Sequence, residues 1–155
     1  MANRFMERAI ALAVANVRNG GGGPFASVVA RDGEIVAEGV NQVVSTLDPT
    51  AHAEVVAIRE ACRRLGHYQL TGCVLYTSCE PCPMCLGAIY WARPDRVYYG
   101  ATRQDAAGSG FDDAFIYDEA AQALDQRRIP MEGLMRQEAL AAFREWDALP
   151  EKFRY

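Results

Sequence analysis

The first forty residues show two different hydrophobic patterns. Residues 3–19 place apolar side chains mostly three and four apart, which gives a helix one buried stripe, and the glycines at 20–23 end it. Residues 25–30 and 35–40 are rich in β-formers instead, and the Asp-Gly pair between them favours a tight turn. The pattern predicts a helix followed by an antiparallel hairpin.

Helices and strands alternate in the stretch that follows. Asp48 suits an N-cap and Pro49 suits the first helical position, so we expect a helix from Pro49 to just before Gly66. A buried strand, a helix beginning at a proline and a second strand are expected next, at 73–77, 81–92 and 96–99. This alternation implies parallel pairing and an α/β sandwich.

The rest of the chain has a weaker pattern. Residues 104–130 contain glycines and acidic pairs without a clear period, and residues 136–149 again look helical. The sequence shows no repeat, linker or low-complexity tract. With 155 residues, one domain covering 1–155 is the expected organisation.

Composition excludes several classes of protein. Half of the residues are apolar and 23% are charged, with a net charge of −4, which fits a globular chain and disfavours a strongly basic nucleic-acid binder. Because there is no apolar run of 18 residues and no charged-then-apolar leader, we expect neither a membrane span nor a secretory signal. Five cysteines, three of them within 79–85, favour metal or redox chemistry in the cytoplasm over a secreted disulfide framework.

Two short motifs stand at the heads of predicted helices. They are His52-Ala53-Glu54 and Pro81-Cys82-Pro83-Met84-Cys85. Cysteines three apart on the first turn of a helix lie on one face, so both thiolates can reach one ion, with a histidine as third ligand. Three protein ligands leave tetrahedral zinc one open position, where a bound water becomes acidic. The motifs therefore predict a hydrolytic zinc site.

Glu54 has a separate role in this hypothesis. Residues two apart on a helix diverge by about 200°, so His52 and Glu54 cannot both ligate one ion from the middle of a helix. They can flank an ion at the N-terminal end of the helix. We therefore predict that Glu54 lies beside the bound water and carries its proton to a ring nitrogen and then to a leaving amine.

The cysteine pair has two interpretations, because Cys79 with Cys82 and Cys82 with Cys85 both match C-x-x-C. Pro81 at the helix start places the second pair on the first turn, so we choose that pair and treat Cys79 as a packing residue. A thioredoxin-like redox pair would leave the His-Ala-Glu motif unexplained. A structural zinc knuckle lacks a fourth ligand, because the only other histidine, His67, lies past the predicted helix end and is interpreted as a surface or packing residue.

These motifs resemble the H-x-E and P-C-x-x-C signature of the zinc-dependent cytidine/deoxycytidylate deaminase superfamily. Longer stretches at 48–54, 76–93 and 110–117 resemble bacterial guanine deaminases more closely, in a likeness that runs along nearly the whole chain. The resemblance implies a three-layer α/β/α sandwich of the cytidine deaminase type, with a mixed central sheet and an antiparallel N-terminal hairpin. It also implies hydrolytic deamination of guanine to xanthine and ammonia by a zinc-activated water. The alternative is another zinc-dependent deaminase, acting on guanosine, cytosine or tRNA adenosine.

The resemblance assigns roles to individual residues. It implies one Zn²⁺ per chain, bound by His52, Cys82 and Cys85, with Glu54 as the proton shuttle. The residues expected to contact the substrate are Asn41, Phe25, Asp113, Trp91, Ala53 and Tyr155. Elementary chemistry supports part of this set, since a carboxylate accepts hydrogen bonds from the ring N–H groups of guanine and a flat purine needs aromatic walls.

The resemblance also implies a homodimer of single-domain zinc-dependent deaminase chains. Residues 136–155 are expected to swap between subunits, so that Tyr155 closes the partner's pocket. Beyond this dimer we expect a small-molecule nucleobase as substrate, and neither a membrane nor a nucleic acid as partner. A zinc-bearing binding module without turnover is a further hypothesis, which requires Glu54 to be idle and the fourth zinc position to be filled by protein.

Ordinary structural interpretations of the substrate-contact residues stay open. In this interpretation, Asn41 would cap a turn, and Phe25 and Trp91 would belong to the core. In the same interpretation, Asp113 and its acidic neighbour would lie in a solvated loop, and Tyr155 would lie at a frayed chain end.

Overall fold

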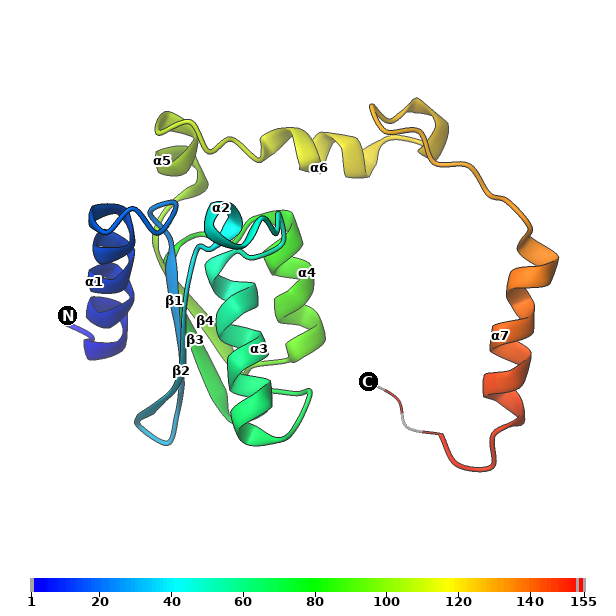
Figure 1. Ribbon diagram of the computed structural model, residues 1–155, viewed down its shortest axis with the longest axis horizontal. Helices are drawn as coiled ribbons and strands as arrows, with labels where there is room; N and C mark the ends of the chain where they lie inside the picture. Colours follow the sequence, from blue (N-terminus) through cyan, green and yellow to red (C-terminus); the bar gives the residue numbers. More distant parts are fainter. Residues whose placement is uncertain (1, 153, 155) are drawn as a thin grey trace. The chain divides into compact units, whose positions relative to one another are not determined.

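The computed structural model describes residues 2–152 and 154. The chain divides into two compact units, residues 1–113 and 114–155, and each is described by itself. The first unit is built on a four-stranded sheet with helices on its faces (Figure 1).

The sheet is mixed and has the order β2-β1-β3-β4. Its strands are β1 (Ala26–Arg31), β2 (Glu34–Val40), β3 (Cys73–Cys79) and β4 (Arg96–Ala101). Strand β1 pairs antiparallel with both β2 and β3, whereas β3 and β4 are parallel. The predicted hairpin is therefore confirmed, but parallel pairing holds only for β3 and β4. Strands β2 and β3 do run in the same direction, as expected from the helix between them, but β1 lies between the two.

The helices of the first unit lie in two layers (Figure 1). Helix α1 (Arg4–Arg18) covers one face of the sheet, and α3 (Ala53–Leu65) and α4 (Pro83–Ala92) cover the other. Two short helices that the hydrophobic pattern did not predict are α2 (Val43–Thr46) and α5 (Arg103–Gly108). This arrangement confirms the three-layer α/β/α sandwich.

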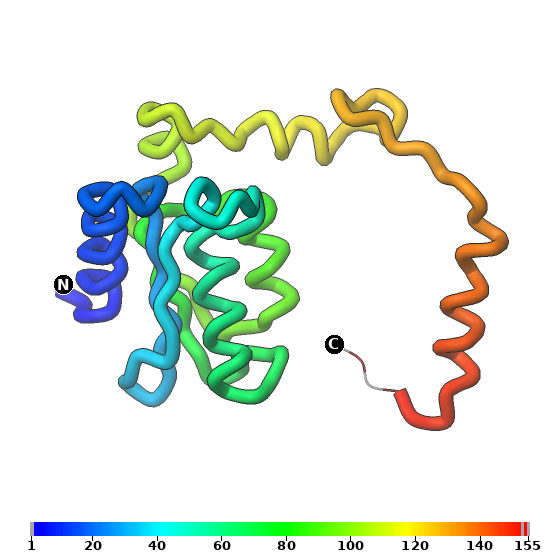
Figure 2. The backbone as a smooth tube through the Cα atoms, viewed as in Figure 1, coloured from blue at the N-terminus to red at the C-terminus, as the bar shows by residue number. Residues whose placement is uncertain are grey.

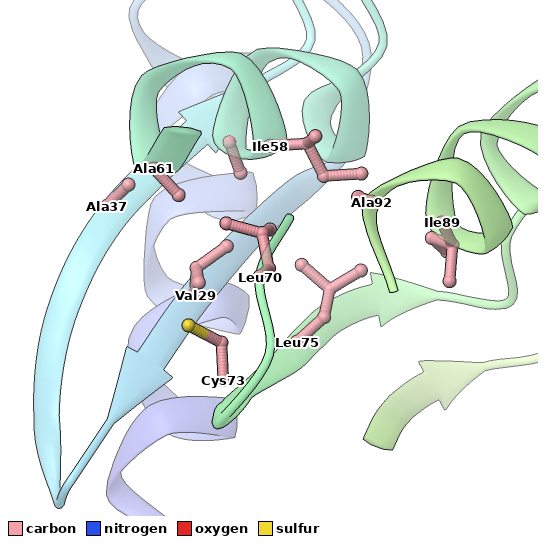
Figure 3. Close-up of a cluster of buried hydrophobic side chains, with 10 residues drawn as sticks. Val29, Ala37, Ile58, Ala61, Leu70, Cys73, Leu75, Ile89 and Ala92 are labelled. Carbon is pink, nitrogen blue, oxygen red and sulfur yellow. The ribbon is translucent and has the colours of Figure 1, made fainter. Parts of the chain in front are cut away.

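The core reflects the alternation of side chains along β1. Val28 and Ala30 face α1, whereas Val29 between them faces α3 and α4. Figure 3 shows the larger of the two clusters, in which Val29 and Leu75 meet Ile58 and Ile89 from the two helices. Close packing on this face fixes where the helices begin relative to the sheet.

The start of α3 differs from the prediction. The helix begins at Ala53 rather than Pro49, and His52 is its N-cap in an extended conformation (φ −68°, ψ 153°). The reason is that Asp48 forms a turn of its own: its Oδ1 accepts hydrogen bonds from the backbone N and the hydroxyl of Thr50, at 2.8 and 2.7 Å. His52 is consequently left on extended backbone just before the helix.

The second unit contains α6 (Ala114–Ala121), a 3₁₀ turn η1 (Leu124–Gln126) and α7 (Arg136–Ala148), whose backbone is traced in Figure 2. The helix predicted at 136–149 is confirmed. None of the residues at 114–152 and 154 is buried. Exposed apolar side chains recur along the unit, among them Leu124, Ile129, Leu134 and Phe143. Over the described part of the chain, the helices fall short of the length and apolar character needed to cross a bilayer.

Candidate metal centre

The candidate metal centre lies where α3 and α4 begin. Cys82 is the N-cap of α4, with extended backbone (φ −67°, ψ 168°), and Pro83 is the first helical residue. Helix α4 thus starts two residues later than predicted from Pro81. The cause is Pro83, because the residue before a proline is driven out of the helical region. His52 and Cys82 are both N-caps, and Cys85 follows in the first turn of α4.

The three predicted zinc ligands converge. His52 Nδ1 lies 3.5 Å from the Sγ of Cys82 and 3.6 Å from the Sγ of Cys85, and the three ligand atoms all lie within 4.8 Å of one another. With typical bond lengths of about 2.3 Å to sulfur and 2.0 Å to nitrogen, tetrahedral zinc separates its nitrogen and sulfur ligands by about 3.5 Å. The two nitrogen–sulfur distances therefore suit one zinc ion, and the donor set of imidazole and two thiols suits that metal.

The three ligand groups shift one another's pKa values in different directions. Interaction with Cys85 and with His52 lowers the pKa of Cys82, whereas interaction with Cys82 and burial raise the pKa of Cys85. The hydrogen bond with Cys82 raises the pKa of His52. A lowered pKa favours the thiolate form of Cys82, which is the form that binds a metal ion.

Glu54 lies beside the ligands in the first turn of α3 and is buried. Its Oε2 accepts a hydrogen bond from the Sγ of Cys85 at 3.4 Å, and its Oε1 accepts one from the hydroxyl of Thr77 at 3.3 Å. Burial raises the pKa of Glu54. A carboxylate next to the ligands, with one oxygen turned towards them, occupies the place that a proton shuttle requires.

The remaining cysteine and histidine of the competing interpretations have structural roles. Cys79 is the last residue of β3 and is buried, with its thiol 3.6 Å from the carbonyl oxygen of Thr102, and burial raises the pKa of the thiol to about 11. His67 is exposed; its Nδ1 accepts a hydrogen bond from the backbone N of Gln69 at 2.9 Å, and its ring stacks on Tyr68. Neither residue belongs to the ligand group.

Two of the predicted substrate contacts are neighbours. The backbone N of Asn41 donates to the carbonyl of Phe25 at 3.0 Å, and a Cβ added at Gly23 would lie 3.2 Å from the Phe25 ring and 3.6 Å from Cγ of Asn41. Asn41 also acts as a turn cap, because its Oδ1 accepts from the backbone N of Val43 at 3.3 Å. The Phe25 ring meets Phe111 edge to face at 4.9 Å, a contact that the sequence did not indicate.

The other predicted contacts differ in their positions. Ala53 is fully buried beside His52. Asp113 is half-buried; burial and the negative charge of Cys82 raise its pKa, which couples it to the ligand group. Trp91 is 62% exposed in the last turn of α4, about 13 Å along the helix axis from Cys82, so the fold does not bring it to the ligands of its own chain. Tyr155 lies outside the residues that the structure describes.

Comparisons with known proteins agree with the geometry of the site. The family model of the cytidine and deoxycytidylate deaminase zinc-binding region matches residues 1–101. Guanine deaminase from Bacillus subtilis (strain 168) is 54% identical over 151 residues, which cover 97% of this chain and 97% of that protein. A crystal structure of guanine deaminase from Bacillus subtilis matches with a TM-score of 0.96 at 53% identity, covering 100% of this chain and 99% of the other.

Two further relatives differ in how much of the chain they cover. A structure of guanine deaminase from Nitrosomonas europaea has a TM-score of 0.67 at 32% identity and covers 94% of this chain and 84% of the other. The tRNA-specific adenosine deaminase of Aquifex aeolicus (strain VF5) is 42% identical over 85 residues, which are 55% of this chain and 56% of that protein. Similarity to the two guanine deaminases thus extends over far more of the chain.

Proposed function

Because the chain belongs to the cytidine and deoxycytidylate deaminase family, we propose that it hydrolyses guanine to xanthine and ammonia. The observation that supports this proposal most strongly is the 54% identity to a guanine deaminase over 97% of both chains. That likeness includes the unit after residue 113, which lies beyond the matched zinc-binding region. The convergence of His52, Cys82 and Cys85 supports the metal that this reaction requires.

The chemistry divides between the ion and Glu54. A zinc ion held by the three ligands supplies a Lewis acid that lowers the pKa of a water to about 7. In this reaction Glu54 would accept a proton from the attacking water and deliver it to a ring nitrogen of the base, and would then deliver the second proton to the leaving amine. One C–O bond forms and one C–N bond breaks, so water and guanine become xanthine and ammonia. Burial, which raises the pKa of Glu54, suits a group that must both accept and release protons.

We assign substrate recognition to four of the residues that the resemblance implies. Asn41 and Phe25, which are neighbours, hold and stack on the purine, and Asp113 accepts hydrogen bonds from its ring N–H groups. The coupling of Asp113 to Cys82 supports this placement. Ala53, between the histidine and the glutamate, completes the contacts near the reacting carbon. No position on the substrate is assigned to Trp91 within its own chain.

The active form is a homodimer of single-domain chains located in the cytoplasm, with residues 136–155 exchanged between subunits and Tyr155 closing the partner's pocket. Two observations support this arrangement. Residues 114–152 and 154 include many exposed apolar side chains and no buried residue, and such a segment needs another surface to cover it. The five free cysteines support a reducing compartment.

One assay tests the proposal directly. Ammonia release is measured from guanine, guanosine, adenine, cytosine and cytidine with zinc-loaded protein, and adenosine-to-inosine conversion is measured on tRNA in parallel. We expect guanine to be turned over with the highest kcat/KM. A zinc-loaded protein that ignores guanine and converts one of the others would refute the assignment within the same family.

A further inference from the structure

A pair of buried hydroxyl groups lies under Glu54. Ser27 on β1 and Thr77 on β3 are directly opposite each other in the antiparallel register and are 0% and 1% exposed. The hydroxyl of Ser27 donates to Oγ1 of Thr77 at 3.0 Å. The hydroxyl of Thr77 in turn donates to Oε1 of Glu54 at 3.3 Å. The three side chains therefore form one hydrogen-bonded series that runs from the sheet to the carboxylate.

The position of this pair is unusual for a core. On the same face of the sheet, the next cross-strand pair is Val29 with Leu75, and both are apolar and buried. Burying a hydroxyl is unfavourable unless it is hydrogen-bonded, so valine or alanine would be the ordinary choice at these positions. In this series each hydroxyl has a partner, and the last partner is a carboxylate, to which hydrogen bonds are stronger than to a neutral acceptor.

The series distinguishes the two oxygens of Glu54. Oε1 is bound to Thr77, whereas Oε2 lies 3.4 Å from the Sγ of Cys85, on the side of the metal ligands. The terminal torsion of a glutamate is broad and roughly two-fold, so a carboxylate without an anchor turns easily. A donor on Oε1 therefore fixes which oxygen faces the ligand group and at what angle.

We propose that Thr77, supported by Ser27, is a positioning residue that holds the carboxylate of Glu54 in the orientation needed for proton transfer. This inference rests on the proposed function, in which Glu54 is the proton shuttle. Positioning of a proton-transfer group affects the chemical step and not the affinity for substrate, so its loss lowers kcat and leaves KM nearly unchanged. Ser27 acts on Glu54 only through Thr77, because Thr77 keeps its own hydroxyl when Ser27 is replaced by alanine.

The test compares two substitutions at one position. Thr77→Val keeps the shape and removes the hydroxyl, and we expect kcat for guanine to fall about ten- to a hundredfold, with KM within about twofold of the native value. Thr77→Ser keeps the donor and should recover most of that loss. Ser27→Ala should produce a smaller decrease in kcat. Zinc content should stay at about one per chain in every variant.

Ser78 provides the matched control. It is the next residue of β3, points to the opposite face of the sheet, and accepts a hydrogen bond from the backbone N of Ala26 at 3.0 Å. Ser78→Ala therefore removes a hydroxyl from the same strand without touching Glu54, and kcat should stay at the native value. Equal losses in Thr77→Val and Thr77→Ser would mean that packing and not the donor matters, which would overturn the inference.

Two measurements separate this inference from the proposed function. In a crystal structure of zinc-loaded Thr77→Val, the Glu54 carboxylate should be rotated or disordered relative to the native protein; a carboxylate unchanged in place would overturn the inference whatever the enzyme turns over. In the Glu54→Gln background, Thr77→Val should cause little further loss, because the group it positions is gone, and fully additive losses would contradict it. Failure of the native protein to deaminate guanine would instead refute the proposed function.

Discussion

Gly39 on β2 links the packing of the sheet to the metal centre. A Cβ added at this position would lie 2.3 Å from the carbonyl oxygen of Ala53 and 2.5 Å from the backbone N of Ala57. Both atoms belong to the backbone of α3, so no flexible side chain can move away. To restore an ordinary contact, the first turn of α3 must retreat from the sheet by about 1 Å.

The substitution Gly39→Ala should therefore affect both stability and metal binding. Overpacking of this kind costs about 1–3 kcal/mol, and because the clash is with backbone we expect about 3 kcal/mol, or a Tm lower by roughly 6–12 °C. The same shift moves His52 by about 1 Å, and the distances of 3.5 and 3.6 Å between its Nδ1 and the two sulfurs no longer suit one zinc ion. We expect zinc affinity to fall at least about tenfold.

Calorimetry and zinc titration with a competing chelator measure the two effects. Gly108→Ala is the matched control, because a Cβ there meets no atom within 4 Å and the residue lies at the end of α5. Its stability should be unchanged or slightly higher, since alanine favours helix more than glycine does. A Gly39→Ala protein with native Tm and native zinc affinity would refute the argument that close packing on β2 sets the position of α3.

Three further outcomes test the site itself. Glu54→Gln should retain zinc and lose turnover by on the order of a hundredfold or more, as expected for a general acid and base, and an unchanged rate would rule out the shuttle. Metal analysis should find about one zinc per chain; Cys85→Ala should lose it and Cys79→Ala should keep it, and the reverse result would show that the wrong cysteine pair was chosen. Deletion of residues 152–155 should reduce guanine turnover far more than zinc content, and a fully active truncated protein would contradict the swapped tail.

Local sequence patterns predicted which helices and strands form, but they predicted the first residue of each helix less accurately. The helix periodicity of α1 and the Asp-Gly turn between β1 and β2 depend on neighbouring residues, and both predictions are confirmed. The predicted start of α3 was wrong because Asp48 and Pro49 are equally suited to a helix cap and to an isolated turn. The hydrogen bonds between Asp48 and Thr50 favour the turn.

The residues of the candidate site also differ in how well the sequence predicted them. His52, Cys82 and Cys85 were found from the sequence because metal ligands have characteristic residue types and spacing. Ser27 and Thr77 were missed because a hydroxyl in a strand has no such signature. Their contact joins residues 50 positions apart and depends on the register between β1 and β3, which no local pattern contains. The contact between Phe25 and Phe111 escaped prediction for the same reason.

The start of α4 shows why the metal ligands belong at helix ends. Pro83 forces Cys82 into extended backbone, so the thiol points back over the open first turn, where the backbone N of Cys85 lies 3.5 Å from its sulfur. The unpaired N–H groups and the positive end of the helix dipole favour a thiolate there. His52 is likewise the N-cap of α3 on extended backbone, although its side chain makes no capping hydrogen bond, so two helix ends present their ligands to one point. Backbone geometry at two helix ends thus directs the three ligands to one point, and packing against the sheet fixes where those helix ends lie.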